Sequence, residues 1–434
     1  MNKSLNPQDY SFKFTDCLLG AQTLFIAIGA TVMVPLLTGM DPSVALFTAG
    51  VGTLMFQVIT KGQIPAFLGS SFAFVPATIY GIQMWGLPGT LFGLAVSGLV
   101  YHFISALVYF RGQDFVHRIF PPIITGPIIM NIGLVLAPAA INMAMGKSTD
   151  GKMILIEENT ALTVAFVSLV ATIVTRLFGK GRLKLIPILV GICFGYVTSL
   201  WFDIVDLTRV NNTNWIQIPH FTFPSVNWGA ALVMIPIAAV SAIEHIGDIM
   251  ALGGITRRNY IRYPGLHRSL MGDGFATMFA GAVGGPPNIT YAEVTAGVAI
   301  TKTYNPGIMT WASIVAIALA FVGKVGIFLQ TIPSPVMGGI LILLFGAITV
   351  TGLHLLMQGQ QDLMSPRNMT IVGIVLVIPV GGLTLGADNF AIISKWFNLE
   401  GSNFAISGIG LGGLIGVVLN LILPREDQSK TVAA

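Results

Sequence analysis

Charged residues are scarce in this chain of 434 residues, with 22 Lys or Arg and 18 Asp or Glu, 9% in all. A soluble domain carries about 25%. Hydrophobic residues make up 54% of the chain, and its mean hydropathy is +0.81. So much apolar surface cannot be hidden inside a water-soluble globule, so most of it must face the lipid bilayer. This composition excludes a soluble enzyme and a disordered chain, and it predicts a polytopic membrane protein.

Cysteine is also rare, since the chain has only Cys17 and Cys193. Both lie in apolar stretches, so we interpret them as buried packing residues and exclude a secreted disulfide scaffold. No cleavable signal peptide is visible, and the first span is expected to act as the targeting signal. The net charge of +4 is small and its positive residues sit in short loops, so no nucleic-acid partner is expected.

Motifs of soluble enzymes are missing as well. The sequence has no complete phosphate-binding loop of the Gly-x-x-x-x-Gly-Lys-Ser/Thr pattern, so ATP-driven transport by this chain alone is not expected. It has no group of His, Cys and Asp with metal-ligand spacing and no visible nucleophile–base pair. We therefore expect no cofactor, no metal and no enzymatic activity.

Long apolar runs, by contrast, fill the chain. A helix that crosses a bilayer needs about 20 mostly apolar residues. We expect fourteen such spans, at approximately 17–38, 43–60, 64–82, 88–110, 120–140, 159–176, 185–202, 228–252, 269–284, 288–301, 307–330, 335–356, 369–386 and 404–423. With the N-terminus in the cytoplasm, 13 Lys or Arg residues fall in inner loops and four in the tails, against four in outer loops. By the positive-inside rule, this asymmetry predicts that both termini are cytoplasmic.

Fourteen spans divide into seven and seven, and because seven is odd the second half enters from the opposite side, as in an inverted repeat. The third segment of each half is broken by glycine, proline and small polar residues, at 69–76 and 284–293. Unpaired backbone groups at membrane depth are tolerated only where protein or a water-filled cavity satisfies them. The matched breaks predict one site near the midplane, with half-helix N-termini aimed at it. The alternative is that these glycines only allow close helix packing.

Few acidic residues lie inside the spans. Glu244 and Asp248 are four residues apart on one expected helix, which places both on one face. Desolvation and the nearness of like charges should favour the protonated form of at least one of them, which is what proton coupling needs. Glu293 follows the second break and could meet a substrate from the other side, or it could be a first-turn acid stabilised by its helix dipole.

Three further titratable residues are expected to have other roles. Asp16 and Asp273 lie near the cytoplasmic ends of their expected spans, so we expect both at the membrane interface. His245 points away from the face of Glu244 and Asp248, and we expect it to be a structural partner rather than a proton carrier.

Three motifs carry a resemblance to a known family: PAFLGSSFAF at 65–74, EHIG at 244–247 and GGPPNITY at 284–291. With them the chain resembles the nucleobase–ascorbate transporter family over nearly its whole length, and most closely its bacterial uracil permease branch. Glu293 supplies the opening carboxylate of the family signature, and Thr301-Lys302 supplies its close. Val294 and Ala296 depart from the Asn and Gly of that signature, and these departures bear on the substrate. Asp248 likewise stands where the uracil branch can carry His.

The resemblance implies an all-α membrane fold of fourteen segments in two inverted sevens, with short antiparallel strands in broken segments 3 and 10. It implies a core domain built from helices 1–4 and 8–11 and a gate domain built from helices 5–7 and 12–14. In this chain the core domain would comprise residues 1–118 and 228–331. The gate domain would comprise residues 119–227 and 332–434.

The resemblance also implies which residues bind the base: Ser71, Phe72, Glu244, Ala292, Glu293 and Phe345. Glu244 and Glu293 would accept hydrogen bonds from ring N–H groups, and backbone groups at Phe72 and Ala292 would bind the other polar edge. Phe345 would close the pocket from the gate domain. Protonation of Asp248, Glu244 or Glu293 would provide the coupling, and the sequence does not rank these three.

These observations predict a proton-coupled nucleobase importer, with uracil as the first candidate, that works by movement of the core against the gate domain. We expect it in a bacterial cytoplasmic (inner) membrane, with a nucleobase and protons as partners and, from the resemblance, a homodimer through the gate domains. A xanthine, guanine or urate symporter is the alternative within the family. An anion transporter of the same architecture is the alternative from another class, although the acidic site disfavours anions.

Overall fold

The protein is described by a computed structural model that covers residues 9–112, 121–359, 361–385 and 408–424. Most of these residues are helical. Among them, seven helices of at least 18 residues are long and apolar enough to cross a bilayer, and shorter apolar helices accompany them. The expectation of a polytopic, helical membrane protein is confirmed.

The helices and strands follow one another along the chain in this order: η1 (Phe14–Asp16), α1 (Cys17–Thr38), α2 (Pro42–Ile59), β1 (Leu68–Ser70), η2 (Phe72–Phe74), α3 (Val75–Arg111), α5 (Pro122–Ala144), α6 (Glu158–Phe178), η3 (Gly181–Leu185), α7 (Pro187–Trp201), α8 (Thr208–Asn211), α9 (Trp228–Thr256), η4 (Ile261–Gly265), α10 (Leu266–Val283), β2 (Asn288–Thr290), α11 (Ala292–Thr301), α12 (Gly307–Ala320), α13 (Gly323–Gln330), α14 (Ser334–Gln358), α15 (Pro366–Leu385) and α17 (Gly408–Ile422).

Most expected spans coincide with one helix to within a few residues. Helix α3 contains the end of the expected span 64–82 and all of the span 88–110, and a kink at Gly86, whose backbone is not helical (φ 69°), separates the two parts where the expected spans divide. The expected span 307–330, by contrast, consists of two helices, α12 and α13. The start of the expected span 404–423, before residue 408, lies outside the described residues.

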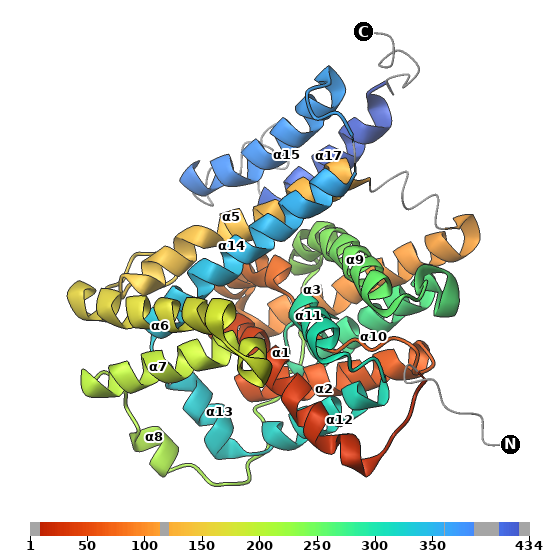
Figure 1. The fold of residues 1–434 in the computed structure, drawn as a ribbon. Helices are drawn as coiled ribbons and strands as arrows, with labels where there is room; N and C mark the ends of the chain where they lie inside the picture. The colour runs from red at the N-terminus through yellow and green to blue at the C-terminus, as the bar shows by residue number, and fades with distance from the viewer. Residues whose placement is uncertain (1–8, 113–120, 360, 386–407, 425–434) are drawn as a thin grey trace, which may run out of the picture.

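The helices form two groups that alternate along the chain (Figure 1). Helices α1, α2, α3, α9, α10, α11 and α12 pack around the two strands, and we call this group the strand bundle. Helices α5, α6, α7, α14, α15 and α17 form a flanking bundle, in which α5 and α14 lie side by side. Each group therefore combines one segment from the first half of the chain with one from the second half.

Small residues let helices from the two halves approach closely within each bundle. In the strand bundle, a Cβ added to Gly98 of α3 would lie 2.6 Å from the carbonyl oxygen of Gly274 in α10. In the flanking bundle, a Cβ added to Gly352 of α14 would lie 2.6 Å from the carbonyl oxygen of Gly126 in α5. Such backbone-to-backbone contact is typical of helix packing in membranes.

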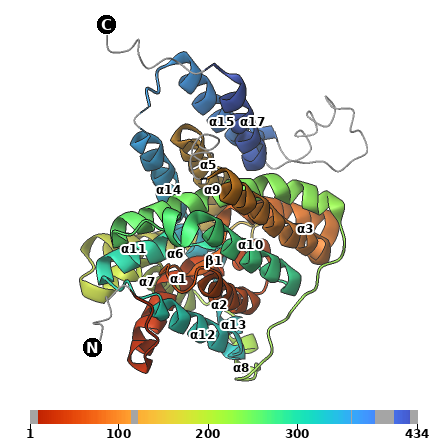
Figure 2. The ribbon, with the colours of Figure 1, turned by 90° about the vertical axis from the view of Figure 1, so that its right-hand side faces the viewer.

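The two strands meet near the middle of the strand bundle, where Figure 2 shows β1 among α1, α2 and α10. They pair antiparallel, and the register places Leu68 opposite Thr290 and Ser70 opposite Asn288. All residues of both strands are buried. The short strands expected in the two broken segments are therefore present.

Both cysteines are free, in agreement with the expectation of no disulfide. The expectation that both are buried is wrong, because Cys193 is exposed and Cys17 is only partly buried. Cys193 lies on a face of α7 that no other described helix covers, and an apolar residue in a membrane helix can be accommodated by lipid as well as by protein.

Candidate functional site

The strand pairing brings the two breaks of the chain together. Beyond the three paired positions, the N–H of Ser71 donates to the carbonyl oxygen of Pro287 at 2.8 Å. On the opposite strand, the N–H of Tyr291 donates to the carbonyl oxygen of Phe67 at 3.2 Å. The hydroxyl of Tyr291 also donates to the carbonyl oxygen of Ser70 at 2.9 Å. One compact hydrogen-bonded unit thus holds both breaks at one depth.

Each strand leads directly into the N-terminus of a helix. Phe72 begins η2, which continues into α3, and Ala292 begins α11. The first N–H groups of a helix have no partner inside it, and the helix dipole makes this end partially positive. The structure therefore sets two groups of backbone N–H donors, from opposite halves of the chain, on either side of the paired strands.

Four carboxyl groups gather beside these helix ends. Glu244 and Asp248 come from α9, Glu293 is the second residue of α11, and Asp273 comes from α10. Glu244 lies within electrostatic range of Glu293 and Asp273, and Asp248 lies within electrostatic range of the other three. The cluster combines the two acids of α9 with the acid of the second break, as the sequence predicts.

Glu244 has an acceptor that the protein leaves unused. Its Oε2 atom is buried and has no hydrogen-bond partner among the residues that the structure describes. A buried polar atom without a partner costs free energy, so such atoms are rare and often mark a binding site. Helix α9 also contacts the first break one turn earlier, because the hydroxyls of Ser241 and Ser71 lie 3.2 Å apart.

An aromatic contact joins the two bundles at the same place. The ring of Phe72, from the first break, meets the ring of Phe345, from α14, edge to face at a centroid distance of 5.8 Å. Both side chains are buried. The ring of Phe345 thus contributes an apolar wall from the flanking bundle, next to the polar groups of the strand bundle.

Asp273, expected at the membrane interface, lies in the interior of the strand bundle and not on its surface. Asp273 is fully buried, and its Oδ2 atom lies 2.7 Å from Nδ1 of the equally buried His245. The position of Asp273 near one end of a span suggested exposure, but the partner comes from α9 and is invisible to local reasoning. His245 has the structural contacts expected of it, with the hydroxyls of Thr290 at 3.1 Å and Ser269 at 2.9 Å.

Sequence reasoning missed the residues that tie this cluster to the strands. Thr290, the last residue of β2, donates from its hydroxyl to Oδ2 of Asp248 at 3.3 Å. Ser241 contacts Ser71, and the buried Tyr101 of α3 lies within electrostatic range of Asp273 and Glu244. These are common residue types in unremarkable positions, so only their spatial neighbours distinguish them.

The fold and this site together define a membrane carrier with one polar site between two broken segments. A model of the permease family matches residues 15–387. The chain is 44% identical to the "Probable uracil permease" of Haemophilus influenzae, over 96% of both chains. It is 42% identical to the "Uracil permease" of Bacillus caldolyticus, over 95% of this chain and 92% of that one. The chain belongs to this family of permeases, the nucleobase–ascorbate transporter family, and it is therefore a transporter and not an enzyme.

Solved structures of more distant proteins share the fold. The transmembrane domain of the cyanobacterial bicarbonate transporter BicA aligns with 94% of this chain and 97% of its own, at 15% identity and a TM-score of 0.59. The murine Slc26a9 anion transporter, in its inward-facing state, aligns with 95% of this chain and 68% of its own, at 12% identity and a TM-score of 0.66. At these identities the likeness concerns the fold alone.

Proposed function

We propose that this protein is a proton-coupled importer of nucleobases and that its substrate is uracil. The observation that carries the proposal is the unpartnered, buried Oε2 atom of Glu244 beside two helix N-termini. The names of the similar proteins support the same substrate, since the relatives from Haemophilus influenzae and Bacillus caldolyticus are uracil permeases by name.

The chemistry of the site suits a flat ring with both donors and acceptors. Uracil presents two ring N–H donors and two carbonyl acceptors. Carboxyl groups of Glu244 and Glu293 can accept from the N–H groups, and backbone N–H groups at Phe72 and Ala292 can donate to the carbonyl oxygens. Ser71 lies beside Phe72 in the first break, and Phe345 would cover one face of the uracil ring. A pocket with few polar groups and an apolar wall is typical of small-molecule sites.

We further propose that the two bundles are the core and gate domains of the transporter. The core domain would comprise residues 1–118 and 228–331, and the gate domain residues 119–227 and 332–434. The packing of α1 to α3 with α9 to α12, and of α5 to α7 with α14, α15 and α17, supports this division. The first boundary, at 118/119, lies outside the described residues. Movement of one bundle against the other would expose the site to each side in turn.

The same proposal includes fourteen crossings arranged as two inverted sevens, with both termini in the cytoplasm. The paired breaks support the inverted repeat, since each strand leads into a helix and the two helices begin beside each other. We place the protein in the bacterial cytoplasmic (inner) membrane and expect a homodimer through the gate domains. Protons would be coupled to transport through Asp248, Glu244 or Glu293.

Uptake of labelled uracil tests this function. Cells that lack their own permeases would express the protein, and uptake would be measured at pH 6 and pH 8, with and without a protonophore. We expect saturable uracil uptake that is stronger at pH 6 and lost with the protonophore. Unlabelled xanthine, guanine and urate serve as competitors. Transport of a purine in place of uracil would change the substrate, and absence of any nucleobase transport would refute the proposal and favour an anion.

A further inference from the structure

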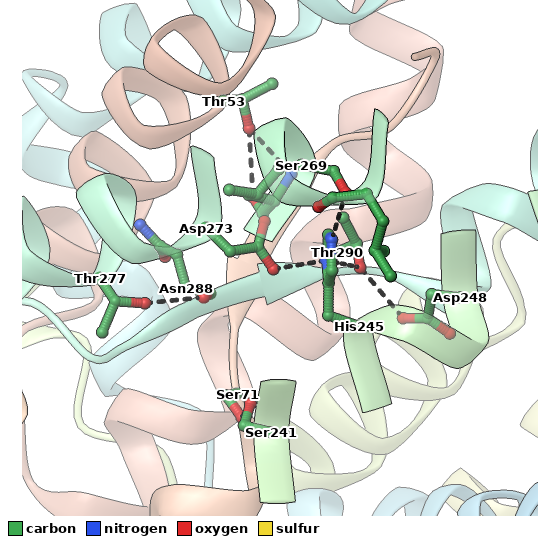
Figure 3. A network of polar contacts seen from close by, with 12 residues as sticks. Thr53, Ser71, Ser241, His245, Asp248, Ser269, Asp273, Thr277, Asn288 and Thr290 are labelled. Atoms are coloured by element: carbon green, nitrogen blue, oxygen red, sulfur yellow. Dashed lines mark hydrogen bonds and ion pairs between the residues drawn. The ribbon is translucent and has the colours of Figure 1, made fainter. Parts of the chain in front are cut away.

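A buried series of polar contacts, an ion pair followed by two hydrogen bonds, connects α10, α9 and β2 (Figure 3). It starts at Asp273, whose Oδ2 lies 2.7 Å from Nδ1 of His245. The same Nδ1 lies 3.1 Å from the hydroxyl of Thr290, which in turn donates to Oδ2 of Asp248 at 3.3 Å. Asp273, His245 and Thr290 are buried, and Asp248 is partly exposed. This series of contacts thus begins in the interior of the protein and ends at a carboxyl group of the candidate site.

The hydrogen-bond partners determine the direction of each donor. Ser269 donates its single hydroxyl proton to the carbonyl oxygen of Leu266 at 3.0 Å, so its oxygen is left to accept from Nε2 of His245 at 2.9 Å. Thr290 donates to Asp248, so its oxygen is left to accept from Nδ1. Both ring nitrogens of His245 are then donors, as in an imidazolium, and Asp273 balances the charge. The Nδ1 proton is shared between Asp273 and Thr290, and the hydroxyl proton of Thr290 points toward Asp248.

We propose that Asp248 carries the coupled proton and that Thr290 is the positioning residue that transmits its protonation to the substrate site. This inference deepens the proposed function and rests on it. An ionised Asp248 accepts a charge-assisted hydrogen bond from Thr290, which is about twice as strong as the neutral bond to a protonated one. A proton that enters as H⁺ joins the carboxylate of Asp248, and no bond within the His245–Asp273 pair breaks.

The position of Thr290 explains how this change reaches the substrate. Thr290 ends β2 and stands three residues before Glu293, with Ala292, the first residue of α11, in between. Loosening the bond between Thr290 and Asp248 therefore frees the end of the strand that positions both the N–H groups and the carboxylate of α11. The opposite end of β2 stays fixed, because Thr277 donates to the carbonyl oxygen of Asn288 at 2.9 Å.

Electrostatics favour Asp248 over the other two acids of the site. The titratable groups around it are Glu244 and His245 on α9, Asp273 on α10, Glu293 on α11 and, next to Glu244 and Asp273, Tyr101 on α3. A proton on Glu244 or Glu293 would turn an acceptor for uracil into a donor. A proton on Asp248 removes one negative charge from the cluster and leaves both acceptors intact. Proton and nucleobase then favour each other's binding, as symport requires.

The test is the pH dependence of uracil binding to the purified protein. For the wild type we expect an affinity about tenfold higher at pH 6 than at pH 8, within the usual range of coupling between two sites. Asp248→Asn should bind uracil with the same affinity at both pH values. Thr290→Val, which loses the hydroxyl but keeps the shape, should lose most of the pH dependence, and Thr290→Ser should restore it.

Thr277→Val provides a matched control, because it removes one buried threonine hydroxyl of α10 that anchors the other end of the same strand, at Asn288. It should lower thermal stability to a similar extent as Thr290→Val and keep the wild-type pH dependence. A wild-type pH dependence in Asp248→Asn or in Thr290→Val would overturn the inference, and so would an equal loss in Thr277→Val. Uracil binding by the wild type that does not depend on pH would overturn this inference alone. Absence of nucleobase binding at either pH would overturn the proposed function as well.

Discussion

The two broken segments share a geometry but not a chemistry. Each has a strand of three residues, one linking residue and a helix that begins at the candidate site. Around β1 the anchoring groups are neutral, as where the hydroxyl of Ser70 donates to the carbonyl oxygen of Thr31 at 2.9 Å. Around β2 they include the His245–Asp273 ion pair and Asp248. The comparison teaches that the backbone of the repeat builds the site, whereas one half supplies nearly all of its charge.

The sharpest difference between the halves lies at the second residue of each helix, where the first break has Ala73 and the second has Glu293. Replacing Glu293 with Gln keeps the shape and removes the charge. Uracil uptake should fall by about 10- to 100-fold, because a hydrogen bond to a charged group contributes about 1.5–3 kcal/mol. Uptake of labelled uracil at matched expression measures this.

Glu158→Gln is the control for this change, since Glu158 is an exposed acid in the first turn of α6. It should transport at the wild-type rate. Wild-type uptake by Glu293→Gln would remove Glu293 from the site, and improved uptake of an anion would favour the alternative class of transporter.

The ion pair of the second half should dominate the stability of the strand bundle. Asp273→Asn leaves the buried His245 without its counter-charge, and breaking a buried pair in this way costs about 3–5 kcal/mol. Thermal or denaturant unfolding in detergent measures the loss. The exposed Asp203 has a left-handed backbone with φ of 54°, which Asn tolerates equally well, so Asp203→Asn should be neutral.

A double-mutant cycle sharpens this prediction. Adding His245→Gln to Asp273→Asn replaces the ion pair with two neutral amides, so the double variant should be more stable than the sum of the single losses allows. Strict additivity of the two losses would show that the pair contributes no coupling, in which case the chemical contrast between the halves would not extend to their stability.

The sequence predicts the repeating architecture better than the chemistry of the site. Apolar runs of about 20 residues locate most helices, because length and composition alone satisfy the bilayer. Glycine and proline in matched places likewise locate the two breaks. The division between α12 and α13 is not predicted, because a short change of direction leaves the hydropathy unchanged.

The buried position of Asp273 shows that local sequence patterns do not predict contacts with another helix. The position of Asp273 near the end of an apolar run suggests the membrane interface. Only the packing of α10 against α9 brings its carboxyl group to His245. The role of Thr290 could not be predicted from the sequence either, since a threonine in a short strand is common. Glu244, Asp248 and Glu293 could be identified because a carboxyl group inside a span is costly wherever it packs.

A third prediction concerns how closely the two breaks approach each other. A Cβ added to Gly69 would collide with the ring of Tyr291 and lie 2.7 Å from the hydroxyl oxygen of Thr31. Gly69→Ala should therefore cost about 1–3 kcal/mol, the usual range for overpacking, and it should also weaken uracil binding by displacing the residue before Ala292. Unfolding and binding measurements on the same preparation check both effects.

Gly254→Ala provides the control for the added methyl group, because a Cβ at Gly254 in α9 meets nothing within 4 Å. Its effect on stability should be neutral or slightly favourable, since alanine has the higher helix propensity. If Gly69→Ala were as stable as this control, the two breaks would have room to separate, and the close pairing would not constrain the site.

The smallest effect is expected at Ser70, which lies opposite Asn288 in the register. Four residues after Thr31, helix α1 has Pro35, which has no N–H to donate back to the carbonyl oxygen of Thr31. The hydroxyl of Ser70 supplies that missing donor. Ser70→Ala should therefore cost about 1 kcal/mol of stability, the usual net value of one hydrogen bond, and leave uracil transport intact.

This last prediction can be tested against its own cause. In a Pro35→Ala background the helix regains its N–H, so the carbonyl oxygen of Thr31 has a donor of its own and Ser70→Ala should cost clearly less than in the wild type. Equal costs in both backgrounds would mean that Ser70 stabilises β1 by some route other than the gap left by Pro35. In that case both broken segments would depend on side chains of their own strand. The two segments would then differ only in whether the anchoring groups are neutral or charged.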